Sequence, residues 1–205
     1  MLMNRIETAV INNPARRAVQ RWYEAPLLQR LGGPLPERAR VLEIGCGPGY
    51  GARLILDAFG AARVDAVDLD PAMARRARRR LAPYAGRARV GVSDATDLSA
   101  LVPENGTYDA VFDFGIIHHI PNWRDALAEV ARVLKPGGVF YFEEVTRHAL
   151  DRAVYRILFD HPEQDRFTDT EFLDALGAHG LHVRGHRTIV FGDFVLGAAQ
   201  ARLNA

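Results

Sequence analysis

Two histidines stand side by side in the stretch FDFGIIHHIPNW, which runs from residue 112 to residue 123. His118 and His119 follow an apolar run and precede a proline, so they fall where a buried strand gives way to a loop. Imidazoles at such a position can accept a proton, bind a metal ion or simply end the strand. Metal binding is the least favoured of the three, because adjacent residues rarely converge on one ion and no third ligand is spaced nearby.

A glycine-rich segment, VLEIGCGPGYGA, contains the second set of residues that could do chemistry. Its glycines at 45, 47, 49 and 51 allow a tight turn and let a ligand approach main-chain N–H groups directly. The helix that follows favours an anionic group at its first turn. Both a nicotinamide cofactor and S-adenosylmethionine fit this pattern. The dinucleotide fingerprint is satisfied as GPGYGA from Gly47, two residues late relative to the end of the strand.

Two acids follow the next two predicted strands. Asp68 comes at the carboxyl end of one strand, where a carboxylate can accept hydrogen bonds from both hydroxyls of a ribose. Asp94 follows the next strand and can accept from an adenine amino group. Because parallel strands present their carboxyl ends at one edge of a sheet, these acids and the glycine loop together predict an adenosine site.

The elements that must position these residues alternate along the chain. Strands are predicted at 40–44, 64–68, 87–92, 108–114 and 139–145, with helices at 50–59, 71–81 and 122–134 between them. Asn122 and Asp125 are predicted to form a capping box at the last of these helices. Two short helices joined at Asn13 and Pro14 are expected over 5–31. Further helices are expected at 149–160 and 168–179, and β segments at 181–190 and 194–199. This alternation indicates an α/β fold with a doubly wound parallel sheet.

Composition narrows the possible classes of protein. A length of 205 residues favours a single domain, and 48% hydrophobic with 25% charged residues is typical of a globular protein. A formal charge of +1 argues against nucleic acid and against an anionic membrane, and the arginine run at 75–80 is predicted to be a solvated helix face. Cys46 is the sole cysteine, which favours a reducing compartment. With no signal peptide pattern and no long apolar span, a cytoplasmic monomer or homodimer without stable membrane insertion is expected.

The chain resembles the class I S-adenosylmethionine-dependent methyltransferases over residues 40–145. The resemblance rests on VLEIGCGPG, AVDLDPAM, SDATDL, YDAVFDFGIIHHIPNW and VARVLKPGGVFYFEE, in the order and spacing of that family. It implies a Rossmann-like sheet of seven strands with an antiparallel last strand. It also implies a helical N-terminal cover over 1–36, a cofactor-binding core over 37–145, a lid-like insertion over 146–167, and a last helix and strands over 168–205.

The resemblance also implies a set of residues that bind S-adenosylmethionine. Glu43 would brace the loop, Asp68 would bind the ribose hydroxyls and Leu69 would pack on the adenine. The full set is Glu43, Gly45, Cys46, Gly47, Asp68, Leu69, Asp94, Ala95, Asp113 and Phe114. Tyr50 stands where many relatives have a small or polar residue.

The expected reaction is methyl transfer to a small-molecule acceptor. A general base is needed only when the nucleophile arrives protonated, and the candidate catalytic residues are His118, His119 and Glu143. Strand alternation predicts that Glu143 and Glu144 point to opposite faces, so that one of them faces the site. Further candidates for the acceptor pocket and its lid are Arg147, His148, His161 and Arg166.

Three alternatives remain open from the sequence. The first is methylation of a lipid or quinone-like acceptor, with an apolar wall made by Trp22, Tyr23, Leu27, Ile157, Leu158 and Phe159. The second is a nicotinamide-dependent oxidoreductase, and the third is a cofactor-binding protein without catalysis. No metal is expected in any of them.

Overall fold

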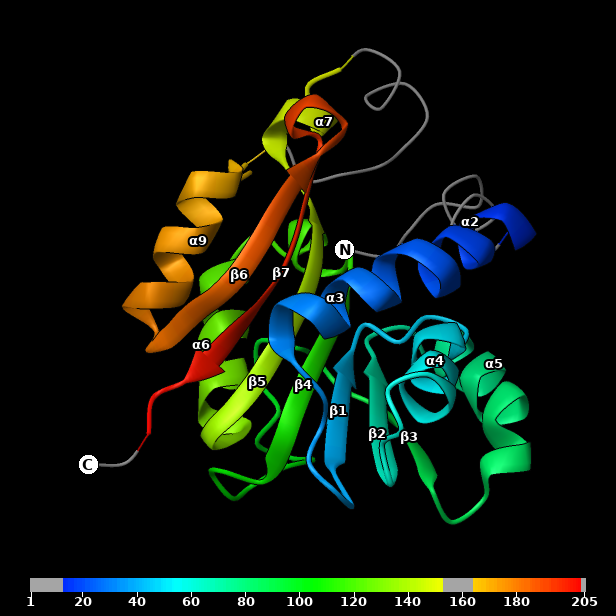
Figure 1. Ribbon diagram of the computed structural model, residues 1–205. Coiled ribbons are helices and arrows are strands. Elements are labelled where there is room, and N and C mark those ends of the chain that lie inside the picture. The colour runs from blue at the N-terminus through cyan, green and yellow to red at the C-terminus, as the bar shows by residue number, and fades with distance from the viewer. Residues whose placement is uncertain (1–12, 153–163, 204–205) are drawn as a thin grey trace.

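A twisted seven-stranded sheet with helices on both faces organises the chain (Figure 1). The computed structural model describes residues 13–152 and 164–203. The strand order is β3-β2-β1-β4-β5-β7-β6, and β7 runs antiparallel to both of its neighbours, while the other pairs are parallel. The prediction of a doubly wound sheet with an antiparallel last strand is confirmed.

The strands lie close to their predicted positions, with one exception. They are β1 Arg40–Ile44, β2 Arg63–Asp68, β3 Ala88–Val92, β4 Tyr108–Phe114, β5 Leu134–Val145, β6 Leu181–Ile189 and β7 Phe194–Ala201. β5 begins five residues before its predicted start, because residues 135–138, predicted to be a loop that ends the preceding helix, continue the strand. Tyr108 pairs with Leu134 and Ala110 with Val139, so these four residues form an irregularity in the ladder.

Most helices also agree with the sequence pattern. They are α2 Pro14–Val19, the π-helix η1 Gln20–Glu24, α3 Ala25–Gly32, α4 Tyr50–Asp57, α5 Pro71–Leu81, α6 Trp123–Val133, α7 Arg147–Leu150 and α9 Asp169–Ala178, with short 3₁₀ turns at η2 Ala82–Tyr84, η3 Ile117–His119 and η4 Val190–Gly192. The predicted junction at Asn13 is a helix start, since its side chain accepts a hydrogen bond from the Arg16 N–H at 2.8 Å. The helical predictions for 5–12 and 153–160 fall outside the described residues.

Two hydrophobic cores lie on the two faces of the sheet. Helices α6 and α9 cover one face, and α3, α4 and α5 cover the other (Figure 1). The central strands are buried on both faces, which explains why they read as nearly continuous apolar runs. Within the described part of the chain, no helix has the length and apolar character needed to cross a bilayer.

An aromatic stack fixes the N-terminal helix to the centre of the sheet. Phe112 and Tyr141 stack with ring centroids 4.5 Å apart, and Phe59 meets Phe112 edge-on at 4.7 Å. The Tyr141 hydroxyl donates to the carbonyl of Gly33 at 2.8 Å. Gly32 packs directly on the same ring, because a Cβ there would lie 2.2 Å from a Tyr141 carbon. From this anchor the helical segment extends back to α2, where Arg16 contacts Glu143 near the carboxyl end of β5.

The two helices α6 and α9 begin differently. The predicted capping box at α6 is wrong, since the Asn122 side chain caps no backbone N–H and instead donates to Asp125 Oδ2 at 2.7 Å. Helix α9 has a complete capping box. Thr168 Oγ1 accepts from the Glu171 N–H at 3.1 Å, and the Glu171 carboxylate accepts from the Thr168 N–H at 2.8 Å.

The capping box at α9 gives a test of local stability. We expect Thr168→Ala to lower the free energy of unfolding by about 1 kcal/mol, because it removes a partner of an otherwise unpaired helix N–H. Thr170→Ala, an exposed change within the same helix, should shift it by less than about 0.5 kcal/mol. Urea denaturation followed by circular dichroism measures both values. Equal stability of the two variants would show that the cap contributes nothing.

Candidate functional site

The glycine loop between β1 and α4 makes the tight turn that the sequence predicts. Gly45, Gly47 and Gly49 have φ values of 64°, 50° and 82°, a region that favours glycine. A Cβ on Gly45 would also lie 2.4 Å from Ile116, so the backbone is pressed against the segment after β4. The thiol of Cys46 is buried inside the turn, and burial raises its pKa. The loop therefore offers a ligand backbone rather than a reactive side chain.

A pocket opens beside this loop at the carboxyl edge of the sheet. It is lined by Gly45, Asp68, Leu69, Asp70, Met73, Ser93, Asp94, Ala95, Ile116 and Ile120. Five of the residues predicted to bind the cofactor are among them: Gly45, Asp68, Leu69, Asp94 and Ala95. Met73, Ile116 and Ile120 form apolar walls that the sequence pattern did not identify, because apolar residues at helical or strand spacing are indistinguishable from core. The pocket combines acids at its rim with apolar surfaces.

Asp68 ties the glycine loop to the end of β2. Its two carboxylate oxygens accept hydrogen bonds from the Gly47 N–H at 2.7 Å and from the Asp70 N–H at 2.8 Å. Burial raises the pKa of Asp68, while these two N–H groups oppose that change. Each carboxylate oxygen has a second lone pair, so Asp68 can still accept from a hydroxyl in the pocket.

The other predicted cofactor residues surround this pocket without lining it. Glu43 lies under the first turn of α4, where a Cβ on Gly51 would come within 1.9 Å of its carboxylate. Phe114 packs at the same place. Asp113 is fully buried at the end of β4, and its Oδ1 accepts from the N–H groups of Gly115 and Ile116 at 3.0 and 2.9 Å. These contacts hold the loop and the end of β4 in place.

Three buried carboxylates at this edge carry an oxygen without a hydrogen-bond partner among the described residues. They are Glu43 Oε2, Asp113 Oδ2 and Glu143 Oε2. Burial raises the pKa of all three groups, and neighbouring carboxylates raise each pKa further. Buried polar groups are normally satisfied, and buried charges are normally paired. These oxygens are therefore available to a ligand that donates hydrogen bonds or carries positive charge.

The histidine pair lies in η3, just after β4. His118 Nδ1 is 2.5 Å from Glu144 Oε2, and the same carboxylate accepts from the Ile117 and His118 N–H groups at 2.6 and 3.1 Å. Burial raises the pKa of Glu144 to about 7. The rings of His118 and His119 lie with centroids 4.2 Å apart, and both residues are buried. Across the described residues, no group of three or more His, Cys, Asp or Glu side chains could hold a metal ion.

Glu143 and Glu144 point to opposite faces of β5, as strand alternation predicts, yet both are buried. Glu143 Oε1 is 2.5 Å from Arg16 Nη2, and Arg16 Nη1 is 2.5 Å from Glu24 Oε2. The sequence pattern gave no sign of Arg16 or Glu24, because charged residues in a short helix are expected to be solvated. The N-terminal helix therefore contributes two charged side chains to this edge.

Several predicted acceptor-site residues lie elsewhere. Trp22 and Tyr23 are 74% and 51% exposed, so the prediction that they wall an apolar pocket is wrong. Arg147 donates to the carbonyl of Arg166, and His148 Nδ1 is 2.8 Å from Asp193, so these side chains are engaged away from the histidine pair. The remaining candidates, Ile157, Leu158, Phe159 and His161, lie outside the described residues.

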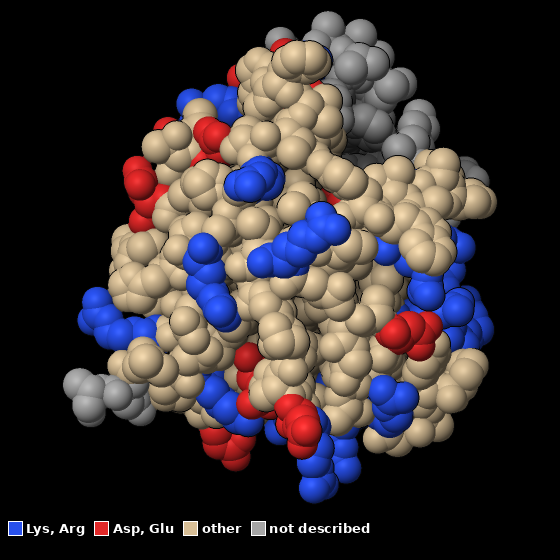
Figure 2. Space-filling model, viewed as in Figure 1, with Lys and Arg blue, Asp and Glu red and all other residues tan. Residues whose placement is uncertain are grey.

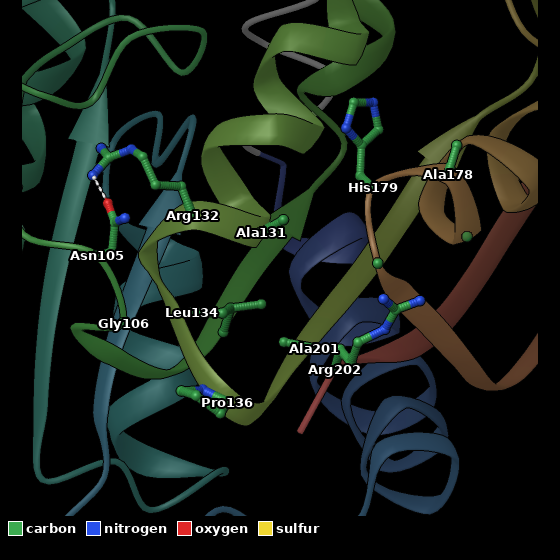
Figure 3. Close-up of a pocket in the computed structure, with 12 residues that line it drawn as sticks. Asn105, Gly106, Ala131, Arg132, Leu134, Pro136, Ala178, His179, Ala201 and Arg202 are labelled. Carbon is green, nitrogen blue, oxygen red and sulfur yellow. Dashed lines mark hydrogen bonds between the residues drawn. The ribbon is translucent and has the colours of Figure 1, made fainter. Parts of the chain in front are cut away.

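A second and larger pocket lies at the opposite edge of the sheet, between the ends of α6 and α9 (Figure 3). It has a volume of about 740 Å³, and six glycine and alanine residues line it together with larger residues that include Arg132, His179 and Arg202. Arg132 donates a hydrogen bond to Asn105 Oδ1, which also lines this pocket, at 3.3 Å (Figure 3). Ligands of open α/β sheets bind at the carboxyl ends of the strands, so the smaller pocket is the candidate site.

Comparison with known proteins decides between the cofactors that the loop alone allows. A family model described as a methyltransferase domain matches residues 41–138. The chain is also 34% identical, over 168 residues, to the malonyl-(acyl-carrier protein) O-methyltransferase of Halorhodospira halophila, which covers 76% of this chain and 56% of the relative. The chain belongs to the class I S-adenosylmethionine-dependent methyltransferases.

Two further comparisons place this methyltransferase among its relatives. It is 32% identical over 126 residues to the trans-aconitate 2-methyltransferase of Variovorax paradoxus, across 59% of this chain and 46% of that protein. The methyltransferase thus spans about half the length of these curated relatives. A solved structure from Pyrococcus horikoshii has the same fold, with a TM-score of 0.74, 23% identity and coverage of 94% of this chain and 93% of that one.

The buried acids of this methyltransferase fit the cofactor that the family implies. S-adenosylmethionine carries a sulfonium and an ammonium against one carboxylate, so its methionyl end is a net cation. The unpartnered oxygens of Glu43 and Asp113 can accept hydrogen bonds from such a cation. The pocket beside Asp68 and Asp94 offers acceptors for hydroxyl and amino groups between apolar walls.

The position of Asp68 generates a test of this site. We expect Asp68→Ala to weaken the binding of S-adenosylhomocysteine by about tenfold or more, because a carboxylate at this edge is the natural partner of ribose hydroxyls. Asp97→Ala is a matched control, since Asp97 lies at the same sheet edge but does not line the pocket. Calorimetric titration of both folded variants measures the effect, and an unchanged affinity of Asp68→Ala would remove the assignment.

Proposed function

We propose that this chain transfers a methyl group from S-adenosylmethionine to a small polar molecule. The observation that carries the proposal is the pocket at the carboxyl edge of the sheet, which places Asp68 and Asp94 between apolar walls, with the unpartnered oxygens of Glu43 and Asp113 near the ends of the neighbouring strands β1 and β4. Relatives named for malonyl-(acyl-carrier protein) and trans-aconitate support a polar acceptor.

The cofactor would be held by the residues that surround the glycine loop. Asp68 would accept from the ribose and Asp94 from the adenine, with Leu69, Ala95 and Ile116 as the apolar surfaces around the rings. Gly45, Cys46 and Gly47 would pass the methionine part, and Glu43, Asp113 and Phe114 would support it from the ends of β1 and β4. When bound, S-adenosylmethionine supplies an activated methyl group. An electron pair of the acceptor would form a bond to the methyl carbon while the carbon–sulfur bond breaks, and the electrons of that bond would remain on sulfur.

The protein's main contribution to the rate would be orientation. Holding an acceptor in line can lower a barrier by roughly 7–11 kcal/mol, whereas a general base contributes about 10²–10⁴-fold. His118 is the proposed base, since Glu144 fixes its ring through Nδ1 and stabilises its protonated form. His119, buried against the His118 ring, is proposed to shape the pocket.

The alternatives lose their particular support. The lipid or quinone hypothesis depended on an apolar wall, and Trp22 and Tyr23, which were to form part of it, are exposed. The nicotinamide hypothesis depended on the glycine pattern alone, and the glycine loop lies within the residues that match the methyltransferase-domain family. A non-catalytic cofactor-binding protein would bind S-adenosylmethionine yet release no S-adenosylhomocysteine with any acceptor.

Cofactor binding should be coupled to proton release. Burial and like charge raise the pKa values of Glu43 and Asp113, and a cation binds their ionised form. The affinity for S-adenosylmethionine should therefore rise with pH as these two groups ionise. Calorimetry in phosphate and in Tris measures the protons released. Glu43→Gln should release fewer protons on cofactor binding than the wild-type protein, whereas Glu37→Gln, an exposed change, should release as many. A cofactor affinity that does not change with pH would contradict the involvement of these buried acids.

A screen for S-adenosylhomocysteine release with amines, thiols, phenols and carboxylates tests the function itself. With the active acceptor in hand, His118→Ala should lower kcat by about 10²–10⁴-fold and leave cofactor affinity nearly unchanged. His182→Ala, an exposed change on β6, should have no effect on either quantity. Wild-type turnover by a folded His118→Ala variant would rule out His118 as the base.

A further inference from the structure

The N-terminal helix has its polar side turned inward. Gln20 and Glu24 are only 8% and 6% exposed, whereas Val19, Trp22 and Tyr23 are 48%, 74% and 51% exposed. A helix that covers a protein core normally shows the opposite pattern, with apolar residues inside and polar residues in water. Core packing therefore does not explain this segment, and the inward polar face needs another reason.

The change of polarity coincides with a change of helix type. Gln20–Glu24 is a π-helix between two α-helical segments, and single π turns occur frequently at functional sites. Immediately after it, Ala25 and Leu28 of α3 are buried in the core in the ordinary way. The inward polar residues are thus confined to the part of the helix that lies above the carboxyl edge of the sheet.

This inward face meets Glu143 and brings two buried carboxyl groups to one guanidinium. One guanidinium, that of Arg16, lies 2.5 Å from both Glu24 and Glu143, so two buried carboxylates share one cation. Glu143 is buried, with only 5% of its surface exposed, and its Oε2 accepts no hydrogen bond from any described residue. Burial raises the pKa of Glu143, and the charges of Glu24 and Asp113 raise it further.

A purely structural ion pair would not need this composition. One arginine and one glutamate suffice to attach a helix to a strand, and a second buried carboxylate adds a desolvation cost without a second cation. An additional positive group would remove that cost. A carboxylate ligand would instead become the third anion around one guanidinium, and an apolar ligand would leave Glu143 Oε2 unsatisfied.

We propose that Arg16, Gln20, Glu24 and Glu143 form the acceptor-recognition site, and that they bind an acceptor carrying a protonated amine. Glu143 Oε2 and the free lone pairs of Glu24 accept from the ammonium group, and Gln20 adds a second buried polar residue of the same π-helix. Arg16 holds the two carboxylates in position. Glu143 is then a binding residue rather than a catalytic one. This inference rests on the proposed methyltransferase function, since it names the class of acceptor for that site.

The test measures binding to the full chain saturated with S-adenosylhomocysteine. The probes are matched triplets of an amine, an alcohol and a carboxylate on one carbon skeleton, in butyl, benzyl and cyclohexylmethyl series. We expect the amine of at least one triplet to bind about tenfold or more tightly than its two partners. A carboxylate or alcohol that binds as well as its amine in every series overturns the proposal, and so does a panel in which no amine binds.

Variants connect this preference to the site. Glu143→Gln and Glu24→Gln should each weaken amine binding by about tenfold, with S-adenosylhomocysteine affinity within about threefold of wild type. Glu37→Gln, an exposed change, is the control. If Glu143→Gln fails to fold, Gln20→Leu and Glu24→Gln provide the same comparison, and unchanged amine affinity in both overturns the site. Loss of cofactor binding by the wild-type protein would defeat the proposed function instead, so the two failures are distinct.

Discussion

Five carboxylates are buried at the carboxyl edge of one sheet: Glu43, Asp68, Asp113, Glu143 and Glu144. Removing such groups from water is costly unless positive charge or N–H donors compensate. Asp68 and Glu144 are compensated by backbone N–H groups, and Glu144 additionally by His118. The other three each retain an oxygen without a described partner. These three oxygens are therefore the acceptors at this edge that a hydrogen-bond-donating or cationic ligand can use.

The packing of the fold holds these acidic side chains away from water and in fixed positions relative to one another. The aromatic stack of Phe59, Phe112 and Tyr141 fixes the strands from one side and anchors the N-terminal helix through Gly33. That anchor brings Arg16 to within 2.5 Å of a carboxylate 127 residues further along the chain. On the opposite face, α6 and α9 cover the core beneath the histidine pair (Figure 1). The visible surface shows charged side chains scattered over the tan background, without a single dominant patch (Figure 2).

Local sequence patterns predicted most of the helices and strands, and they predicted the site residues that lie at the ends of strands. Strand and helix periodicity placed β1 to β4 within one residue, and the glycine loop and Asp68 followed from turn chemistry and strand direction. What sequence could not supply was pairing over long distances. Arg16 and Glu24 look like solvated helix residues until Glu143 is beside them, and Trp22 and Tyr23 look like core until the helix turns them outward. Asn122 satisfied the pattern of a cap, yet its side chain bonds to Asp125 instead.

A crystal structure of the S-adenosylhomocysteine complex would locate the ligand ammonium relative to the buried acids. We expect the adenosine to lie between Asp68 and Ile120, and the ligand ammonium to lie within hydrogen-bond distance of the unpartnered oxygen of Glu43 or Asp113. The same structure should leave Glu143 Oε2 without a contact from the cofactor, available to the acceptor. A ligand bound in the pocket between α6 and α9, or an ammonium held by backbone carbonyls away from every buried carboxylate, would contradict this expectation.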